Sequence, residues 1–459
     1  MQAPLSQRPK RRVARRSQRV MAENVYIISF GVSRLFGKID YSEVIVASEQ
    51  VNDDKIGVIF GDNGTGKTTL LHLIYATLSS QDNAGLRTYI AKTYFKQFFV
   101  TLSDGTTITL LREDDSYFGS YRYKVDGPKI SLDLFIEASL EGIVRDQDSV
   151  NELHRFLKYL DLDVLFVDHE RYVRSTYAFL NDTSYAEDHL FLYNSLDASD
   201  ISRGRDTRKR DKSLQFPLAG MIDAVNLAFR SQAFRQGTAG DVNASSVYLE
   251  IVRAIARRKK PGPSPQKDEM PFEALLESLE GETSSYVAHG LLSSYPFQDI
   301  LQLYDSSSKP RRDRIKEALT PFIASINRRV AALKDVHTLM KNFEQEVNLY
   351  LRDKTASVHA LDGLLVKSED RALNINMLSS GERQLLFLLS AAIVSRGARS
   401  LILIDEPELS LNYKWQRRIA SSLRTLSSAS STQFIMATHS IEIISKFAGT
   451  AFELENESS

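Results

Sequence analysis

Apolar and polar residues alternate in several short runs near the start of the chain, and this alternation predicts β-strands. The runs are "VYIISFGV" from Val25, "SEVIVAS" from Ser42, "KQFFVTLSDGTTITLLRED" from Lys96 and "YRYKVDG" from Tyr121. Asp-Gly pairs interrupt the last two, as tight turns between antiparallel strands do. We therefore predict an antiparallel meander in the first third of the chain.

Helical and strand patterns alternate in the last third of the chain. Apolar runs of helical spacing are "RQLLFLLSAAIVSR" and "YKWQRRIASSLRTL", and the strands between and after them are "SLILIDE", "TQFIMATHS" and "TAFELE". Alternation of this kind is typical of a mostly parallel sheet covered by helices. The predicted fold class is α/β, a mixed parallel sheet with helices on both faces and an antiparallel lobe.

The middle of the chain carries a different pattern. Between residues 311 and 354, apolar positions recur every three or four residues, which predicts a short helical hairpin or arm, interrupted by Pro321. Residues 202–212 and 256–267 are basic and polar, and the second stretch resembles an exposed linker. We divide the chain into a basic tail, a first lobe, a mainly helical insertion and a second lobe, at residues 1–22, 23–180, 181–360 and 361–459.

Composition narrows the class of protein. With 42% hydrophobic and 25% charged residues, the 459-residue chain has the balance of a soluble globular protein. It has no cysteine, which excludes disulfides and thiolate metal sites and fits a cytoplasmic location. The longest apolar stretch, around residues 385–394, is too short to span a bilayer. We therefore expect no membrane partner.

The first 20 residues hold seven basic groups and no acidic one, in a chain whose net charge is zero. The basic residues are Arg8, Lys10, Arg11, Arg12, Arg15, Arg16 and Arg19. Such a tail is consistent with a disordered leader, a nucleic-acid-binding arm, or translated sequence upstream of a true start at Met21.

The stretch "GDNGTGKT" follows an apolar strand and opens a helical pattern. It matches in full the phosphate-loop pattern GxxxxGKS/T. Glycines let backbone amides approach phosphates, Lys67 neutralises the β and γ phosphates, and Thr68 offers a hydroxyl to Mg²⁺. The predicted nucleotide-binding residues are Gly61, Asp62, Asn63, Gly64, Thr65, Gly66, Lys67, Thr68 and Thr69.

Two later strands end in groups suited to phosphate chemistry. "SLILIDEPELSLN" delivers Asp405 and Glu406 to the carboxyl edge of a parallel sheet, where such sheets bind ligands. There Asp405 would orient Mg²⁺ through water, and Glu406 would polarise the attacking water. "FIMATHS" ends on His439, which we expect to reach the γ-phosphate.

The stretch "NINMLSSGERQLLFLLSAA" starts a helix with Ser379, Ser380 and Gly381. Free amides and hydroxyls at a helix start favour an anion. A subunit that already holds phosphate has no evident use for a second anion site, so we expect a second subunit to use this one.

In this order, "GDNGTGKT", "LSSGE", "LILIDEPELSLN" and "ATHS" resemble the Walker A, signature, Walker B with D-loop, and switch-histidine motifs of ABC-type ATPases. The resemblance implies ATP and Mg²⁺ as ligands, bound between two heads. It also implies a signature that acts in trans, made up of Ser379, Ser380, Gly381 and Glu382. The implied D-loop consists of Ser410, Leu411 and Asn412.

Within that superfamily the chain is similar to the RecF, SMC, Rad50 and OLD-like branch, and more closely to stand-alone ATPases of antiphage systems of the PARIS and Septu type. Those proteins act with a separate nuclease. One motif departs from the family: the strand "DVLFV" leads into Asp168, His169 and Glu170 where a Q-loop glutamine is usual. Gln97 and Gln147 are alternatives for that glutamine.

Three hypotheses follow. The leading one is a hydrolysing ATPase whose head-to-head dimer or higher oligomer acts as a switch on a nuclease or toxin in antiviral defence. The second is a RecF/Rad50-like ATPase that binds DNA in repair. The third is a scaffold or sensor of a viral protein that binds ATP without hydrolysing it.

Overall fold

The computed structural model describes most of the chain, over residues 25–47, 55–80, 85–113, 115–168, 173–175, 218–240, 252, 271–397, 399–428, 430–447 and 449–455. The predicted basic tail (1–22) and the basic stretches at 202–212 and 256–267 lie outside these residues. The observations on which the DNA-binding hypothesis rests therefore lie outside them too.

A six-stranded sheet forms the centre of the molecule. Its order is β15 (Ala451–Glu453), β3 (Ile56–Phe60), β14 (Gln433–Ala437), β13 (Ser400–Asp405), β8 (Asp163–Val167) and β9 (Val173–Ser175). All neighbours are parallel except β8 and β9. The strands β8, β13 and β14 are buried throughout, as expected for a parallel sheet covered on both faces. The predicted α/β class is confirmed.

Alternate residues of the sheet point into two separate cores. Leu401 and Leu403 of β13 pack with α1 (Lys67–Leu78), α2 (Leu86–Lys92) and α3 (Gln147–Leu160). Ile402 and Ile404 pack on the other face, in a core with α5 (Leu218–Gly240), α9 (Lys309–Asn348), α10 (Ser380–Val394) and α11 (Tyr413–Ser427). The helix that follows the phosphate loop and the helix that begins with the signature thus cover opposite faces of one sheet.

A second six-stranded sheet is the predicted antiparallel meander. Its order is β2 (Ile39–Ile45), β1 (Ile27–Leu35), β4 (Gln97–Leu102), β5 (Thr107–Leu111), β6 (Tyr121–Asp126) and β7 (Ser131–Ile136). Its apolar face shares the core of α1. The buried guanidinium of Arg112 donates to the carbonyls of Ile90 and Thr93, at 2.7 and 2.9 Å, and so fixes the end of α2 to this sheet.

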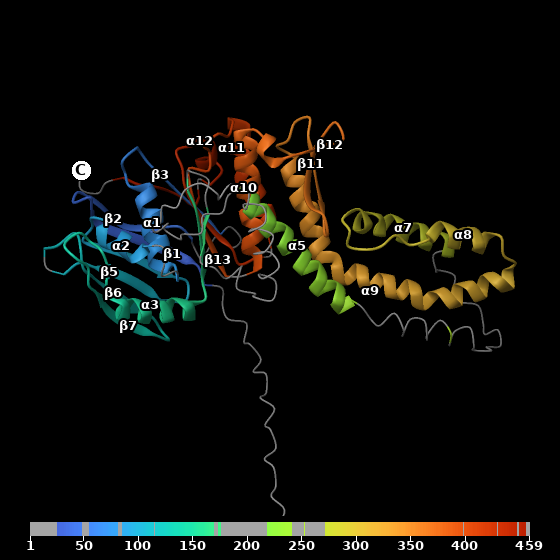
Figure 1. Ribbon diagram of the computed structural model, residues 1–459, viewed down its shortest axis with the longest axis horizontal. Coiled ribbons are helices and arrows are strands. Elements are labelled where there is room, and N and C mark those ends of the chain that lie inside the picture. Colours follow the sequence, from blue (N-terminus) through green and yellow to red (C-terminus); the bar gives the residue numbers. More distant parts are fainter. Residues whose placement is uncertain are drawn as a thin grey trace, which may run out of the picture.

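A helical arm extends from the sheets (Figure 1) and consists of α7 (Phe272–Ala288), α8 (Phe297–Asp305) and the 40-residue α9. At 1.5 Å per residue, α9 is about 60 Å long. The predicted interruption at Pro321 is wrong, because the helix runs through it. A proline inside a helix costs about 3 kcal/mol. Buried apolar residues that follow it, such as Ile323 and Ile326, offset that cost.

A small three-stranded sheet, which no sequence pattern predicted, joins the arm to the signature helix. It consists of β10 (Thr355–His359), β11 (Gly363–Ser368) and β12 (Arg371–Leu373). Its first two strands straddle the predicted domain boundary at residue 360, so the division of the chain into domains stays a prediction. Short helical turns complete the described chain, at η1 (Ile375–Met377), η2 (Ser395–Gly397) and α12 (Ile441–Ile444).

None of the helices within the described residues combines the length and the apolar character that a membrane span requires.

Candidate nucleotide site

The phosphate loop wraps around the side chain of Lys67. Gly66 caps α1 with a left-handed backbone, at a φ of 87°, which a side chain would strain. The ammonium of Lys67 donates to the carbonyls of Gly61 and Asp62, at 2.9 and 2.8 Å. Since an ammonium has three protons, one is left for a phosphate oxygen at the mouth of the loop.

The charge of Lys67 is set by its surroundings. The residue is only 7% exposed, and burial lowers the pKa of its ammonium. The carboxylates of Glu406 and Asp405 act in the opposite direction and favour the charged form. The cation therefore faces two acidic groups from the end of β13, which come from more than 300 residues later in the chain.

The hydroxyl of Thr68 donates to the carboxylate of Asp405 at 2.9 Å. Within the described residues, no group of three or more His, Cys, Asp or Glu could hold a metal ion on its own. Mg²⁺ suits such a place, because it is commonly bound by one or two carboxylates together with substrate phosphates. Thr68 and Asp405 therefore fit Mg²⁺ that arrives with a nucleotide.

Glu406 and His439 follow neighbouring strands at the same sheet edge. Glu406 has a left-handed backbone, with a φ of 50°, and its amide donates to the carbonyl of Ala437 at 2.9 Å. The amide of His439 donates to Glu408 Oε1 at 2.6 Å, while its side chain is exposed. Glu408 thus ties the turn after β13 to the loop after β14.

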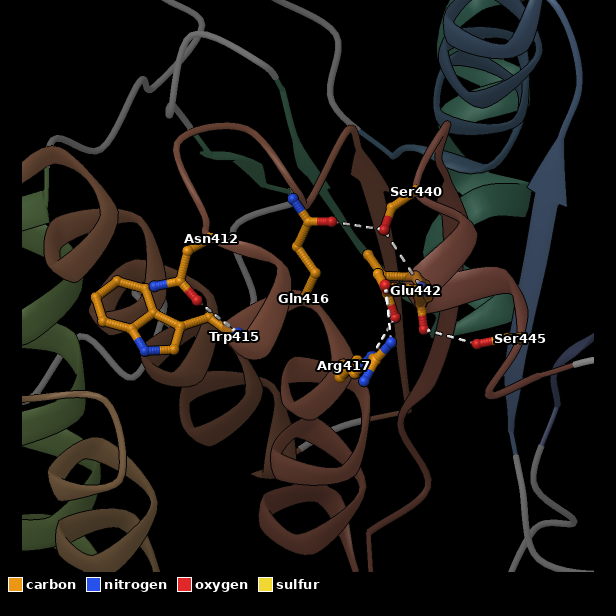
Figure 2. A network of polar contacts seen from close by, with 8 residues as sticks. Asn412, Trp415, Gln416, Arg417, Ser440, Glu442 and Ser445 are labelled. Atoms are coloured by element: carbon orange, nitrogen blue, oxygen red, sulfur yellow. Dashed lines mark hydrogen bonds and ion pairs between the residues drawn. The ribbon is translucent and has the colours of Figure 1, made fainter.

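Figure 2 shows how α11 holds the loop that follows His439. Ser440 Oγ donates to Gln416 Oε1 at 2.7 Å and accepts from the amide of Ile443. Asn412 caps α11 by accepting from the amide of Trp415 at 3.1 Å. An ion pair between Arg417 and Glu442 makes a further link between α11 and α12.

The signature helix begins with a complete capping box. Ser379 Oγ accepts from the amide of Glu382 at 3.3 Å, and Glu382 Oε2 accepts from the amide of Ser379 at 2.7 Å. Gly381 is in close contact with the predicted D-loop, because a Cβ there would lie 2.6 Å from the carbonyl oxygen of Ser410. Both Ser379 and Ser380 are exposed.

The predicted Q-loop region is only partly described. Asp168 is buried at the end of β8, next to β13, whereas His169 and Glu170 lie outside the described residues. Gln97 begins β4 in the antiparallel sheet and Gln147 begins α3, so neither follows a strand of the parallel sheet. The role of Asp168 stays a prediction.

Three residues beside the site could not be identified from the sequence. Glu408 lies in the quoted stretch "SLILIDEPELSLN", but only the fold shows that it accepts from the amide of His439. The hydroxyl of Tyr41 donates to the carbonyl of Thr65 at 2.8 Å, and burial raises the pKa of this tyrosine to about 12. The ring of Phe36 is 44% exposed and lies close to Gly66. No motif marks the two aromatic residues, since they come from a turn and a strand far from the loop.

A comparison with protein families matches residues 178–445, more than half of the chain, to the family described as "AAA domain, putative AbiEii toxin, Type IV TA system". The chain belongs to this family. It is therefore an ATPase of the AAA type, and the matched range contains Ser379, Asp405, Glu406 and His439. The phosphate loop at 61–68 lies before the matched range.

Two solved structures are similar to this chain over most of their length. One is the Smc head domain with an extended coiled coil bound to the C-terminal domain of ScpA, derived from Pyrococcus furiosus, with 13% identity, 92% and 91% coverage of the two chains and a TM-score of 0.34. The other is the SmcHead bound to the C-winged helix domain of ScpA, with 12% identity, 92% coverage of each chain and a TM-score of 0.34.

No curated protein matches the sequence. Since the two structural likenesses are weak, the fold description rests on the strand order given above.

Proposed function

We propose that this AAA-type ATPase is a switch that binds and hydrolyses ATP between two copies of the chain, and that closure of the pair controls a toxic partner. The observation that carries this proposal is the contact between Thr68 and Asp405, which brings the phosphate loop and the acidic strand end into one site.

Binding begins at the phosphate loop. The amides at the start of α1 and the charge of Lys67 hold the phosphates, and the exposed ring of Phe36 offers a surface on which a base can stack. Thr68 and Asp405 would hold Mg²⁺, which neutralises phosphate charge when it is bound.

Hydrolysis uses the two groups at the adjoining strand ends. Glu406 accepts a proton from the attacking water, in the role that acidic residues take in phosphoryl transfer. His439 reaches the γ-phosphate from a loop that Glu408 holds by its backbone. Each of these roles needs a side chain at the sheet edge where Lys67 lies.

A second copy is supported by the arrangement of the two helices. Since α1 and α10 cover opposite faces of the sheet, the signature does not face the phosphate loop of its own chain. It is therefore suited to contact the phosphate that a second copy binds. Three exposed apolar residues also flank the motifs: Met377 before the signature (68% exposed), Tyr413 after the D-loop (57%) and Ile441 after the histidine loop (79%). Apolar groups exposed beside functional motifs suit an interface.

The proposal also includes a separate partner protein. The family description applies the word toxin to members of the family themselves, so it identifies no partner. We infer a separate nuclease or toxin, held or released in antiviral defence according to the nucleotide state. The arm, which extends away from the site, is the part that such a partner can reach.

The Glu406→Gln variant tests the proposal, because glutamine keeps the shape of the side chain but has no charge and cannot accept the proton. With ATP and Mg²⁺ it should bind ATP, stop hydrolysing and sediment as a stable dimer in analytical ultracentrifugation. With ADP it should sediment as the wild type does. A Glu406→Gln protein that hydrolyses ATP at the wild-type rate, or that never dimerises with ATP, would contradict the proposal.

The same variant tests the partner. Purified from its native host with ATP and Mg²⁺, it should retain a nuclease or toxin in stoichiometric amount, and exchange into ADP should release that partner. Retention that is equal with ATP, with ADP and in a Lys67→Ala protein would overturn the switch.

A further inference from the structure

The arm is joined to the signature helix through a short segment that we call the arm root, residues 347–354. Here α9 ends and the chain enters β10. The ammonium of Lys354 donates to both carboxylate oxygens of Glu382, at 2.8 and 3.0 Å. The lysine side chain is 23% exposed and that of the glutamate is 6% exposed, so this ion pair is better shielded from solvent than a surface pair.

The carboxylate that Lys354 holds is the one that completes the capping box. Its Oε2 accepts from the amide of Ser379 at 2.7 Å, and Ser379 in turn accepts from the amide of Glu382. An unbroken series of polar contacts therefore runs from the arm root to the first residue of the signature.

The ion pair also affects the charge at the start of α10. Burial raises the pKa of Glu382, but the hydrogen bonds from Lys354 and Ser379 outweigh it, and the net pKa is lowered. The carboxylate is thus charged at neutral pH, at the helix start where a phosphate of the other copy is expected. Without Lys354 that negative charge would repel the phosphate.

A small packing gap lies beside the ion pair of the arm root. A cavity of about 10 Å³, room for about one water molecule, lies between the arm root and α10, and its lining includes Val347, Leu351 and Leu385. Tyr350 donates or accepts a hydrogen bond with Ser422 of α11 at 2.6 Å. The arm root therefore contacts both α10 and α11, and it is held to α10 partly by a polar contact beside a packing gap.

We propose that Lys354 is a positioning residue, which orients the signature helix and neutralises its capping glutamate so that the signature can accept the phosphate of a second copy. A displacement of the arm that withdraws Lys354 would then weaken closure without touching the phosphate loop. This inference rests on the proposed function, since it assigns a regulator to the same trans site.

The test compares three variants of the full chain. Lys354→Met removes the charge and keeps much of the length, Lys354→Arg restores the charge, and Lys367→Met removes a lysine from the neighbouring strand β11 as a matched control. For each, titration with a fluorescent ATP analogue measures binding by the single chain, and sedimentation with ATP in the Glu406→Gln background measures dimerisation.

Lys354→Met should bind the analogue within about twofold of the wild type but dimerise at least about tenfold more weakly, a loss of 1.4 kcal/mol by the usual conversion. Lys354→Arg should recover most of that loss and Lys367→Met should show none. In a Glu382→Gln background, Lys354→Met should have little further effect, because no charge is left to neutralise.

Dimerisation of Lys354→Met equal to that of the Glu406→Gln parent would overturn the inference while leaving the proposed function standing. So would a parallel loss of analogue binding and melting temperature that Lys354→Arg does not recover, since that outcome indicates a general structural role. If the Glu406→Gln parent itself fails to dimerise with ATP, the proposed function fails first.

Discussion

The two helix starts of the nucleotide site, those of α1 and α10, are built in opposite ways. α1 begins after a left-handed Gly66, with no side chain capping it and no acidic residue in its first turn. α10 begins with a complete capping box, in which Ser379 and the acidic Glu382 bind each other's amides.

We expect this difference to separate phosphate binding within one chain from the contact that forms between two copies. The first amides of any helix lack partners within the helix. At α1 no side chain takes them, so they and Lys67 can hold a phosphate within a single chain. At α10 the amides of Ser379 and Glu382 are already occupied, and the negative charge of Glu382 is offset by the ammonium of Lys354. We therefore expect the second start to bind an anion more weakly than the first, as a contact that forms only when two copies close would.

The largest expected effect is on ATP binding at the start of α1, the stronger of the two anion sites. Lys67→Ala removes the cation from the loop while α10 is left unchanged. Since a hydrogen bond to a charged group is worth about 1.5–3 kcal/mol, ATP affinity of the single chain should fall by about 10- to 150-fold. Calorimetric titration with ATP and Mg²⁺ measures it.

A matched control is Lys446→Ala, which removes an exposed lysine after α12. It should bind ATP as the wild type does. If Lys67→Ala bound ATP normally, the assignment of the phosphate loop would be wrong. The proposed difference in function between the starts of α1 and α10 would then be wrong as well.

A smaller effect is expected at α10, in the step that needs two copies. In Gly381→Ala, the added methyl would lie 2.6 Å from the carbonyl oxygen of Ser410 and 2.9 Å from the ring of Trp415, so the D-loop or the helix must shift. Single-chain ATP binding should stay within about twofold, whereas hydrolysis per chain at high protein concentration should fall about tenfold or more, a change of about 1.4 kcal/mol.

Gly66→Ala is the counterpart at α1. Its methyl would lie 2.8 Å from Leu35 on a backbone with positive φ, and it should weaken single-chain binding itself. Equal losses of binding and turnover in both glycine variants would contradict the separation of roles.

Much of this site could be predicted from the sequence, because its motifs are local. The phosphate loop, the strand that ends in Asp405, and the helix start at Ser379 are each marked by residues that adjoin in the chain. Their order along the chain also predicted the parallel sheet that brings the first two together, and the structure confirms that sheet.

What the sequence could not predict depends on distant contacts. Lys354 precedes Glu382 by 28 residues, across a small sheet with no distinctive pattern. Pro321 predicted a break in the helix, yet burial of the apolar positions of α9 outweighs its local cost. The partner of Glu408, the backbone amide of His439, lies 31 residues later in the chain and is brought to it only by the fold.

The smallest expected effect concerns the pH dependence of the capping box. The folded pKa of Glu382 is lowered below its usual 4.5, so its contribution to stability is fully present above that value and is lost as the pH falls through the folded pKa. Glu382→Gln removes the titration. The difference in free energy of unfolding between wild type and variant should be about 1 kcal/mol at pH 7, as for other helix caps, and should shrink as the pH falls below 4.5 through the folded pKa.

Urea unfolding across that pH range measures the difference, and Glu277→Gln, at an exposed position of α7, serves as the control. That control should change stability little at any pH, because its side chain is exposed. The α1 start has no acidic cap to titrate, so acid should weaken the signature helix before it affects the cap of the phosphate-loop helix. A wild-type advantage over Glu382→Gln that shows no decline as the pH is lowered below 4.5 would mean that the carboxylate is not what caps α10.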